Sequence, residues 1–346
     1  MLRPGTAFGT LLSLLLCCTI VQATFAQVLP ADRRPILFPD TPQAWGGTGV
    51  CYGEFRDGQY PGGPQPTEEQ IREDLHIIAR HWSVLRMYSS REATRLACKV
   101  IRADKLPLKV LVGAWIDQES KPGPDGKPID PNPQLARENQ EQVARAIAIA
   151  NDYPDVVLAI NIGNEALVFW SGHLVPRSVI INYLRQARAA TKVPVTTCDT
   201  ELFWTTPESL EVAAECDFIA LHAYAMWNGQ SIRGSLDWTR EQIAKVQARH
   251  PGMTVVMTEL GWATQKGTQG DQARLIKAEP NEQDQEVFFR SLRDWAVEAR
   301  QPYFWFAAFD ENWKGGPEPS EVEKHWGVYR TDRTPKLVFR NYKPAK

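Results

Sequence analysis

The fold of this chain is indicated by one short apolar run, Val156-Val157-Leu158-Ala159-Ile160-Asn161, and by seven similar runs spaced along the sequence. Each run is short and apolar throughout, which is typical of a strand buried on both faces in a parallel sheet. The sequence therefore predicts eight buried strands. They occupy residues 49–52, 84–88, 108–113, 156–161, 193–197, 218–222, 254–258 and 303–308.

Amphipathic stretches lie between most of these runs and predict helices. One begins after Thr67, an N-cap residue that forms a capping box with Gln70. Alternating strands and helices favour a (β/α)8 TIM barrel in a single domain. An open doubly wound sheet is the alternative, but Gly47-Thr48-Gly49 lacks the third glycine of a phosphate-binding loop. The other predicted helices occupy residues 133–150, 176–191, 235–249 and 281–299.

The charge balance bears on the partners of the protein. The chain has 39 Lys+Arg and 41 Asp+Glu, for a formal net charge of −2. A nucleic-acid-binding protein normally carries a basic excess or a basic patch, so we expect no nucleic-acid partner. The 12 tryptophans are a high number and are compatible with a ligand made of rings.

The amino terminus resembles a secretory signal peptide over residues 1–26, with Arg3, an apolar stretch at 11–21 and small residues before the cleavage site. We therefore expect export to the periplasm or the outside of the cell. A Pro-rich N-terminal extension follows at 27–46, and the (β/α)8 domain occupies 47–346. No later stretch approaches the roughly 18 apolar residues of a membrane span, so we expect no integral membrane segment.

Four cysteines remain after the leader: Cys51, Cys98, Cys198 and Cys216. Export permits disulfides, and four cysteines allow three complete pairings. Buried free thiols are the alternative. No CxxC or HExxH spacing is present, so we expect no metal site.

Two glutamates follow predicted strands of the barrel: Glu165 after the fourth and Glu259 after the seventh. Functional side chains of such barrels gather at the carboxyl ends of the strands, so these carboxyl groups should face one cavity. Two carboxyl groups flanking a glycosidic bond are what glycoside hydrolysis needs, one as an acid and the other as a nucleophile with a lower pKa. Asn164 is placed to bind a sugar 2-hydroxyl.

Other polar and aromatic residues follow the same strands. Arg86, Tyr88 and Tyr224 are candidates to hold Glu259 ionised by hydrogen bonds. Trp262 is either a stacking surface for a sugar ring or a packing residue. His222 ends the sixth run, where a polar role in the cleft and a role as a core histidine both remain open.

Six segments in order along residues 48–340 resemble glycoside hydrolase family 17, the β-1,3-glucanase family. The resemblance implies that Glu165 is the acid/base and Glu259 the nucleophile. It also implies that Glu311 and Lys314 are supporting polar residues in the cleft. The matching segments are Gly49-Val50-Cys51-Tyr52-Gly53, Leu85-Arg86-Met87-Tyr88, Gly163-Asn164-Glu165, Glu259-Leu260-Gly261-Trp262, and Phe309-Asp310-Glu311-Asn312-Trp313-Lys314 with His325-Trp326-Gly327-Val328-Tyr329.

The same resemblance implies sugar contacts through Tyr52, Tyr88 and Tyr224. It predicts a retaining endo-type β-1,3-glucanase that forms a covalent glycosyl-enzyme, with carboxyl groups about 5–5.5 Å apart. A transglycosylase with the same two glutamates is the main alternative. A glucan-binding protein without turnover and a clan relative with another polysaccharide substrate are further ones. We expect a monomer that acts on a β-glucan polysaccharide or oligosaccharide and needs no cofactor.

Overall fold

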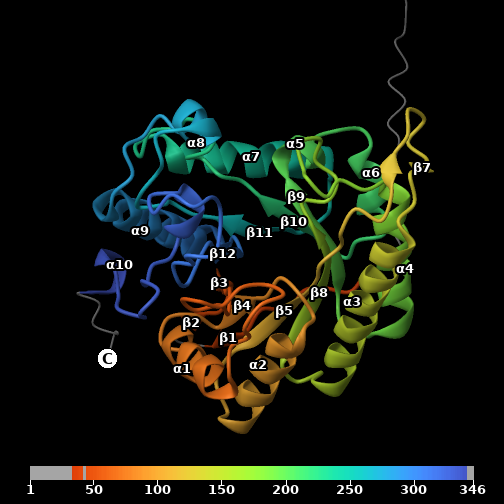
Figure 1. Cartoon of the computed structure of the whole chain (residues 1–346), viewed down its shortest axis with the longest axis horizontal. Coiled ribbons are helices and arrows are strands. Elements are labelled where there is room, and N and C mark those ends of the chain that lie inside the picture. Colours follow the sequence, from red (N-terminus) through yellow and green to blue (C-terminus); the bar gives the residue numbers. More distant parts are fainter. Residues whose placement is uncertain (1–32, 42–43, 341–346) are drawn as a thin grey trace, which may run out of the picture.

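The computed structural model describes residues 33–41 and 44–340. Eight parallel strands form a closed barrel in the order β3-β4-β5-β8-β9-β10-β11-β12 (Figure 1). Each predicted run overlaps one of these strands, which confirms the (β/α)8 fold. The strands are β3 Thr48–Cys51, β4 Val84–Arg86, β5 Lys109–Ala114, β8 Val157–Asn164, β9 Val195–Thr200, β10 Ile219–His222, β11 Val255–Leu260 and β12 Tyr303–Trp305.

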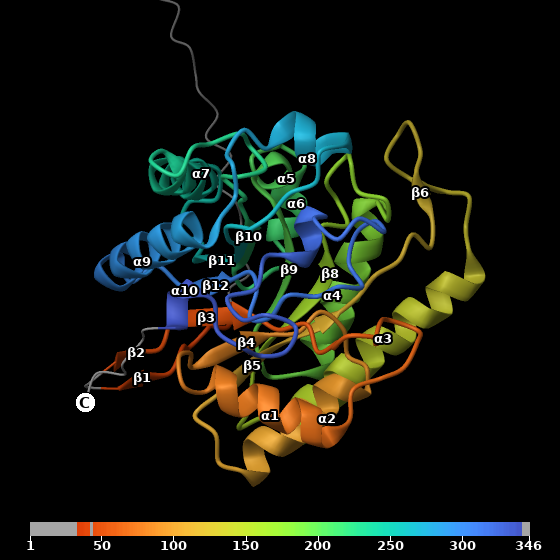
Figure 2. The ribbon, with the colours of Figure 1, turned by 60° about the vertical axis from the view of Figure 1, so that its left-hand side comes forward.

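Helices surround the barrel in both overall views (Figures 1 and 2). The five predicted helices are present, and α2 is an additional one that begins after Arg91 without a side-chain cap. The long helices are α1 Glu68–Ile78, α2 Glu92–Ala103, α3 Pro133–Asp152, α4 Arg177–Ala190, α7 Ser235–Arg249 and α9 Glu282–Ala299. The short ones are α5 Glu201–Trp204, α6 Ser209–Ala213, α8 Gly270–Leu275, α10 Leu337–Arg340 and the 3₁₀ helix Val322–Lys324.

Local sequence explains where α1 begins. The Thr67 Oγ1 accepts a hydrogen bond from the Gln70 N–H at 3.3 Å, and the Gln70 side chain accepts one from the Thr67 N–H at 3.0 Å. The predicted capping box is therefore confirmed. The apolar face of the helix, including Ile71, Leu75 and Ile78, is fully buried against the barrel.

The barrel strands are buried on both faces, as their apolar sequences require. All six residues of β11 are buried, and so are seven of the eight residues of β8. Side chains that point inward fill the barrel, and those that point outward pack under the helices. The strands are therefore a rigid support for the loops that follow them.

Two small hairpins are added to the barrel. One pairs β1 Asp40–Thr41 with β2 Ala44–Trp45, and the other pairs β6 Lys121–Pro122 with β7 Pro128–Ile129. The β6 strand stands out beyond α3 in Figure 2.

The described part of the N-terminal extension is attached at the amino-terminal end of the barrel strands. The Arg34 N–H donates to Asp217 Oδ1 at 2.9 Å, and the Arg34 guanidinium donates to the Val193 carbonyl at 3.0 Å. Asp217 also accepts from the N–H of Val195, the first residue of β9. The predicted signal peptide lies outside the described residues.

The four cysteines outside residues 1–26, Cys51, Cys98, Cys198 and Cys216, are free and buried, so the free-thiol alternative holds. Among the described helices, none is long and apolar enough to cross a membrane.

Candidate active site

Glu165 lies directly after β8, in a turn whose backbone is left-handed. Gly163 has a φ of 77° and Glu165 a φ of 49°, an uncommon value for a residue with a side chain. Two hydrogen bonds to the end of β9 hold this turn. The Glu165 N–H donates to the Cys198 carbonyl at 3.0 Å, and the Leu167 N–H donates to Asp199 Oδ2 at 2.9 Å. Asp199 therefore anchors the backbone turn that carries Glu165, a role that only the tertiary structure reveals.

Glu259 lies within β11 and is almost completely buried. The Arg86 guanidinium forms an ion pair with Oε1, and the Tyr224 hydroxyl donates to Oε2 at 2.5 Å. Burial opposes ionisation of this carboxyl group. The charges of His222 and Arg86 and the Tyr224 hydrogen bond outweigh burial and lower the pKa of Glu259. Glu259 is therefore a carboxylate at neutral pH.

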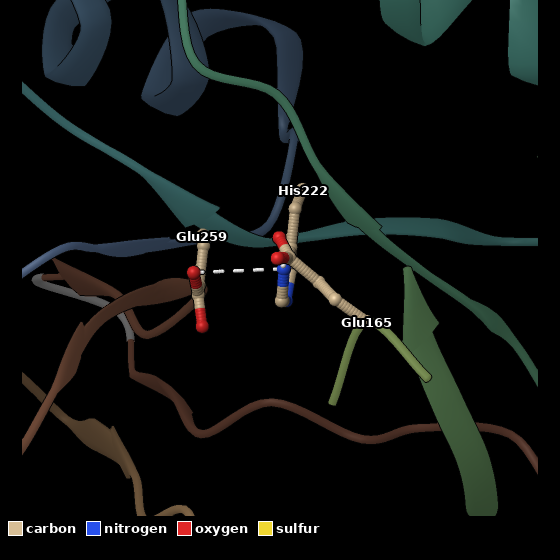
Figure 3. A group of neighbouring side chains, drawn as sticks. All are labelled: Glu165, His222 and Glu259. Atoms are coloured by element: carbon tan, nitrogen blue, oxygen red, sulfur yellow. Dashed lines mark hydrogen bonds and ion pairs between the residues drawn. The ribbon is translucent and has the colours of Figure 1, made fainter. Parts of the chain in front are cut away.

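His222, the last residue of β10, lies between the two glutamates. Its Nδ1 is 2.8 Å from Glu165 Oε1 and 3.5 Å from Glu259 Oε2. Figure 3 shows the three side chains pointing toward one another from three different strand ends. Burial opposes protonation of the imidazole, but the negative charge of Glu259 and the hydrogen bond to Glu165 raise the pKa of His222. The structure thus supports a polar role of His222 in the cleft rather than a role as a core histidine.

Three side-chain atoms, a carboxylate oxygen from each of Glu165 and Glu259 and an imidazole nitrogen of His222, lie within 4.8 Å of one another. A carboxylate oxygen of Glu165 and one of Glu259 are therefore at most this far apart. Such spacing would also suit a metal ion. The carboxylates, however, already pair with two cationic groups, the imidazolium and the Arg86 guanidinium, which would repel a further cation.

Arg86, the last residue of β4, connects the strands that carry the two glutamates. Besides its ion pair with Glu259, it donates from Nη2 to Asn164 Oδ1 at 2.5 Å and to Cys198 Sγ at 3.0 Å. The Asn164 amide oxygen is thus occupied, and its NH₂ group remains as the donor for a ligand. Arg86 therefore sets the orientation of both Glu259 and Asn164.

A second charged group lies after β12. The Lys314 Nζ is 2.6 Å from Glu311 Oε2 and 4.7 Å from the ring centre of Phe306. The largely buried Glu323 interacts electrostatically with Lys314, Glu259 and Glu165, and burial raises its pKa to about 7. The sequence prediction selected Glu311 and Lys314 but missed Glu323, which lies only two residues before the segment that begins at His325.

The side chains of Tyr52 and Trp262 are both fully buried, which contradicts the expected sugar contact of Tyr52 and supports the packing alternative for Trp262. The Tyr52 hydroxyl donates to Asp74 of α1 at 3.0 Å. The Trp262 ring packs on Phe288 of α9, with the ring centres 5.8 Å apart. Both side chains turn outward beneath a covering helix, so neither reaches the cleft.

Tyr224 and Tyr88 remain at the site. Tyr224 makes the predicted hydrogen bond to Glu259. Tyr88 instead faces the Arg86 guanidinium, which lies 4.5 Å from its ring centre.

Comparison with known proteins yields one family match. A family model described as the BtgE/BtgC glycoside hydrolase domain matches residues 49–327. A protein named glucan 1,3-beta-glucosidase from Arthroderma benhamiae is 24% identical over 297 residues, which cover 80% of this chain and 86% of that protein. A putative glucan endo-1,3-beta-glucosidase, btgC of Aspergillus niger, is 24% identical over 298 residues, 80% of this chain. That alignment covers 40% of the longer A. niger protein.

Solved structures of other proteins share the fold, among them the following two. An endo-laminarinase from Formosa Hel1_33_131 superposes with a TM-score of 0.72 at 24% identity, covering 85% of both chains. An active-site mutant of a beta-1,3-glucanosyltransferase from Rhizomucor miehei, in complex with laminaritriose, has a TM-score of 0.66 at 22% identity. It covers 84% of this chain and 96% of that one.

Proposed function

The chain belongs to the BtgE/BtgC glycoside hydrolase family, and on this premise we propose that it cleaves β-1,3-glucan with retention of anomeric configuration. We further assign it to glycoside hydrolase family 17. The curated relatives support the substrate, because they are named for β-1,3-glucan cleavage. The observation that carries the mechanism is the Glu165–Glu259 oxygen separation of at most 4.8 Å. Inverting enzymes need about 6.5–9.5 Å between their carboxyl groups to admit a water molecule.

In the first step, the Glu259 carboxylate attacks the anomeric carbon while Glu165 protonates the departing glycosidic oxygen. The bond from that carbon to the oxygen breaks, and an ester to Glu259 forms. The His222 Nδ1 lies 2.8 Å from Glu165, so a proton held by this pair is available to the leaving group. The free NH₂ of Asn164 donates to the sugar 2-hydroxyl, an interaction that strengthens in the transition state.

In the second step, Glu165 accepts a proton from the acceptor, whose oxygen attacks the anomeric carbon and releases Glu259. Water as acceptor gives hydrolysis, and a sugar hydroxyl gives chain transfer. Transfer is the second candidate function, favoured by two exposed aromatic rings on the loop that carries Glu165. The signal-peptide pattern of residues 1–26 supports action outside the cytoplasm.

The proposal is tested with the mature protein, beginning near residue 27, and β-1,3-linked gluco-oligosaccharides of one defined length. Mass spectrometry follows product length, and NMR follows the anomer formed first. We expect shorter products with β-configuration from the wild type and none from Glu259→Gln. Glu298→Gln, an exposed glutamate on α9, is the matched control and should act as the wild type does. An α-configured first product, or full activity of Glu259→Gln, would contradict the proposal.

A further inference from the structure

Exposed aromatic side chains are gathered on one end of the barrel. Among residues 33–39 and 46–340, whose side-chain exposure the structure describes, the exposed Phe, Tyr and Trp residues are Tyr60, Phe169, Trp170 and Trp313. Tyr60 follows β3, Phe169 and Trp170 follow β8, and Trp313 follows β12. All four thus lie on loops at the carboxyl ends of strands, the same end as Glu165 and Glu259. An exposed aromatic ring is unremarkable singly, but this distribution points to a ligand-binding surface.

The loops with these residues lie on opposite sides of the catalytic pair. In the closed strand order, β9, β10 and β11 separate β8 from β12 on one side, and β3, β4 and β5 separate them on the other. Phe169 and Trp170 therefore lie across the barrel end from Trp313. A linear chain that runs from one side to the other passes over Glu165 and Glu259.

Phe169 and Trp170 occupy the centre of a tight turn, in which the Ser171 N–H donates to the Val168 carbonyl at 3.0 Å. Turn centres normally hold Gly, Pro, Asn, Asp or Ser, because these residues suit the backbone and the solvent. Here Phe169 is 77% exposed and Trp170 is 52% exposed. We call this pair the aromatic turn. Neither folding nor turn geometry accounts for two large rings at this position.

The base of the loop that carries the aromatic turn is held in place. The Val175 N–H donates to the Ala166 carbonyl at 2.9 Å and closes the loop. The His173 Nε2 is 2.6 Å from the Asn164 carbonyl, and its ring lies on Trp115 with centres 4.7 Å apart. The loop therefore presents its rings in a defined place before a ligand binds, which lowers the entropy cost of binding.

We propose that the aromatic turn is an acceptor-side subsite that binds glucose rings of the glucan beyond the cleaved bond. This inference rests on the proposed function. Glu165 must reach the oxygen of the leaving group, and Phe169 and Trp170 follow it by only four and five residues. The apolar C–H face of a β-glucose ring packs on an aromatic face, as other apolar groups do. Trp313, whose indole N–H donates to Glu311 at 2.9 Å, lies on the opposite side of the catalytic pair. It therefore binds the part of the glucan on the donor side of the cleaved bond.

The same subsite holds the incoming sugar in the second step. After the leaving group departs, a second glucan segment bound by the aromatic turn places its hydroxyl near Glu165 and competes with water for the glycosyl-enzyme. The aromatic turn therefore raises the share of transfer relative to hydrolysis. It also raises the rate of cleavage for substrates that have sugar units on the leaving side.

The test compares two substrates that share a donor part. One is a β-1,3-linked gluco-oligosaccharide, and the other is a nitrophenyl β-laminaribioside, whose leaving group contains no sugar. For each enzyme, kcat/KM for the oligosaccharide is divided by kcat/KM for the nitrophenyl substrate. In the variant Phe169→Ala/Trp170→Ala, we expect this ratio to fall about tenfold or more. Each lost stacking contact accounts for about three- to tenfold. The ratio of transfer to hydrolysis products should fall with it.

Val287→Ala removes an exposed apolar side chain from α9, away from the site, and should change neither ratio. Equal loss on both substrates in the double variant would overturn the inference, since it would show a general disturbance of the loop around Glu165. Unchanged ratios would overturn it as well. A wild type that cleaves neither substrate would instead refute the proposed function and this inference together.

Discussion

Replacing Arg86 by methionine removes the cation that pairs with Glu259 while nearly preserving the volume of the side chain. Arg86 is 1% exposed and contacts Glu259, Asn164 and Cys198. Breaking a buried ion pair by removing one partner costs about 3–5 kcal/mol. His222 Nδ1 still lies 3.5 Å from Glu259 and compensates in part, so we expect a loss of about 3 kcal/mol in the free energy of unfolding.

The pH dependence of this loss follows from the pKa of Glu259. That pKa is lowered in the folded protein, so ionised Glu259 stabilises the fold above its unfolded pKa of about 4.3. This contribution disappears as the pH falls through the folded pKa. The difference between wild type and Arg86→Met should therefore be largest near neutral pH and shrink below about pH 4.

The assays are urea denaturation at several pH values and a pH profile of kcat/KM on β-1,3-gluco-oligosaccharides. The acidic limb of that profile reports the ionisation of the nucleophile in the free enzyme. We expect Arg86→Met to lower kcat/KM and to move this limb to higher pH. Arg95→Met is the matched control, because its ion pair with Asp152 is exposed and contributes only about 0–1 kcal/mol. An unmoved acidic limb together with unchanged stability would refute the role assigned to Arg86.

Three further substitutions test single contacts. Tyr224→Phe removes the 2.5 Å hydrogen bond to Glu259, and a hydrogen bond to a charged group contributes about 1.5–3 kcal/mol. We therefore expect kcat/KM to fall about ten- to hundredfold and the acidic limb of its pH profile to move to higher pH. Wild-type kinetics would contradict this. Tyr52→Phe loses a buried hydrogen bond to Asp74, and the midpoint of denaturation should show a loss of about 1 kcal/mol with KM unchanged. A changed KM would restore Tyr52 as a sugar contact. Asp199→Asn weakens the hydrogen bond that anchors the turn after strand β8. Cleavage of oligosaccharides should slow more than cleavage of nitrophenyl glycosides, because nitrophenyl leaving groups need less acid catalysis. Equal slowing of both substrates would assign Asp199 a purely structural role.

The barrel and its two glutamates were accessible from sequence because their signals are local. A strand buried on both faces must be apolar throughout, so the run at 156–161 marks β8 without reference to any other element. The box formed by Thr67 and Gln70 likewise depends on a separation of three residues. Glu165 and Glu259 follow strands, and the closure of the barrel brings such positions together.

The partners of these glutamates were decided by tertiary structure. Beyond a strand end, the direction of a side chain depends on the loop backbone and on the helix that packs over it. Tyr52 turns toward α1 and Trp262 toward α9, although both follow strands as Glu165 does. No local pattern distinguishes these outcomes, which is why the sequence prediction placed Tyr52 in the cleft and left the role of Trp262 open.

The sequence by itself determined the (β/α)8 topology and the positions of Glu165 and Glu259, because burial and strand order follow from neighbouring residues. Only the tertiary structure decided that His222 joins the two glutamates and that Arg86 links Glu259 to Asn164. These contacts join residues up to 173 positions apart in the chain, from four strands of one barrel. Their geometry, and with it the low pKa of Glu259, exists only once the barrel closes.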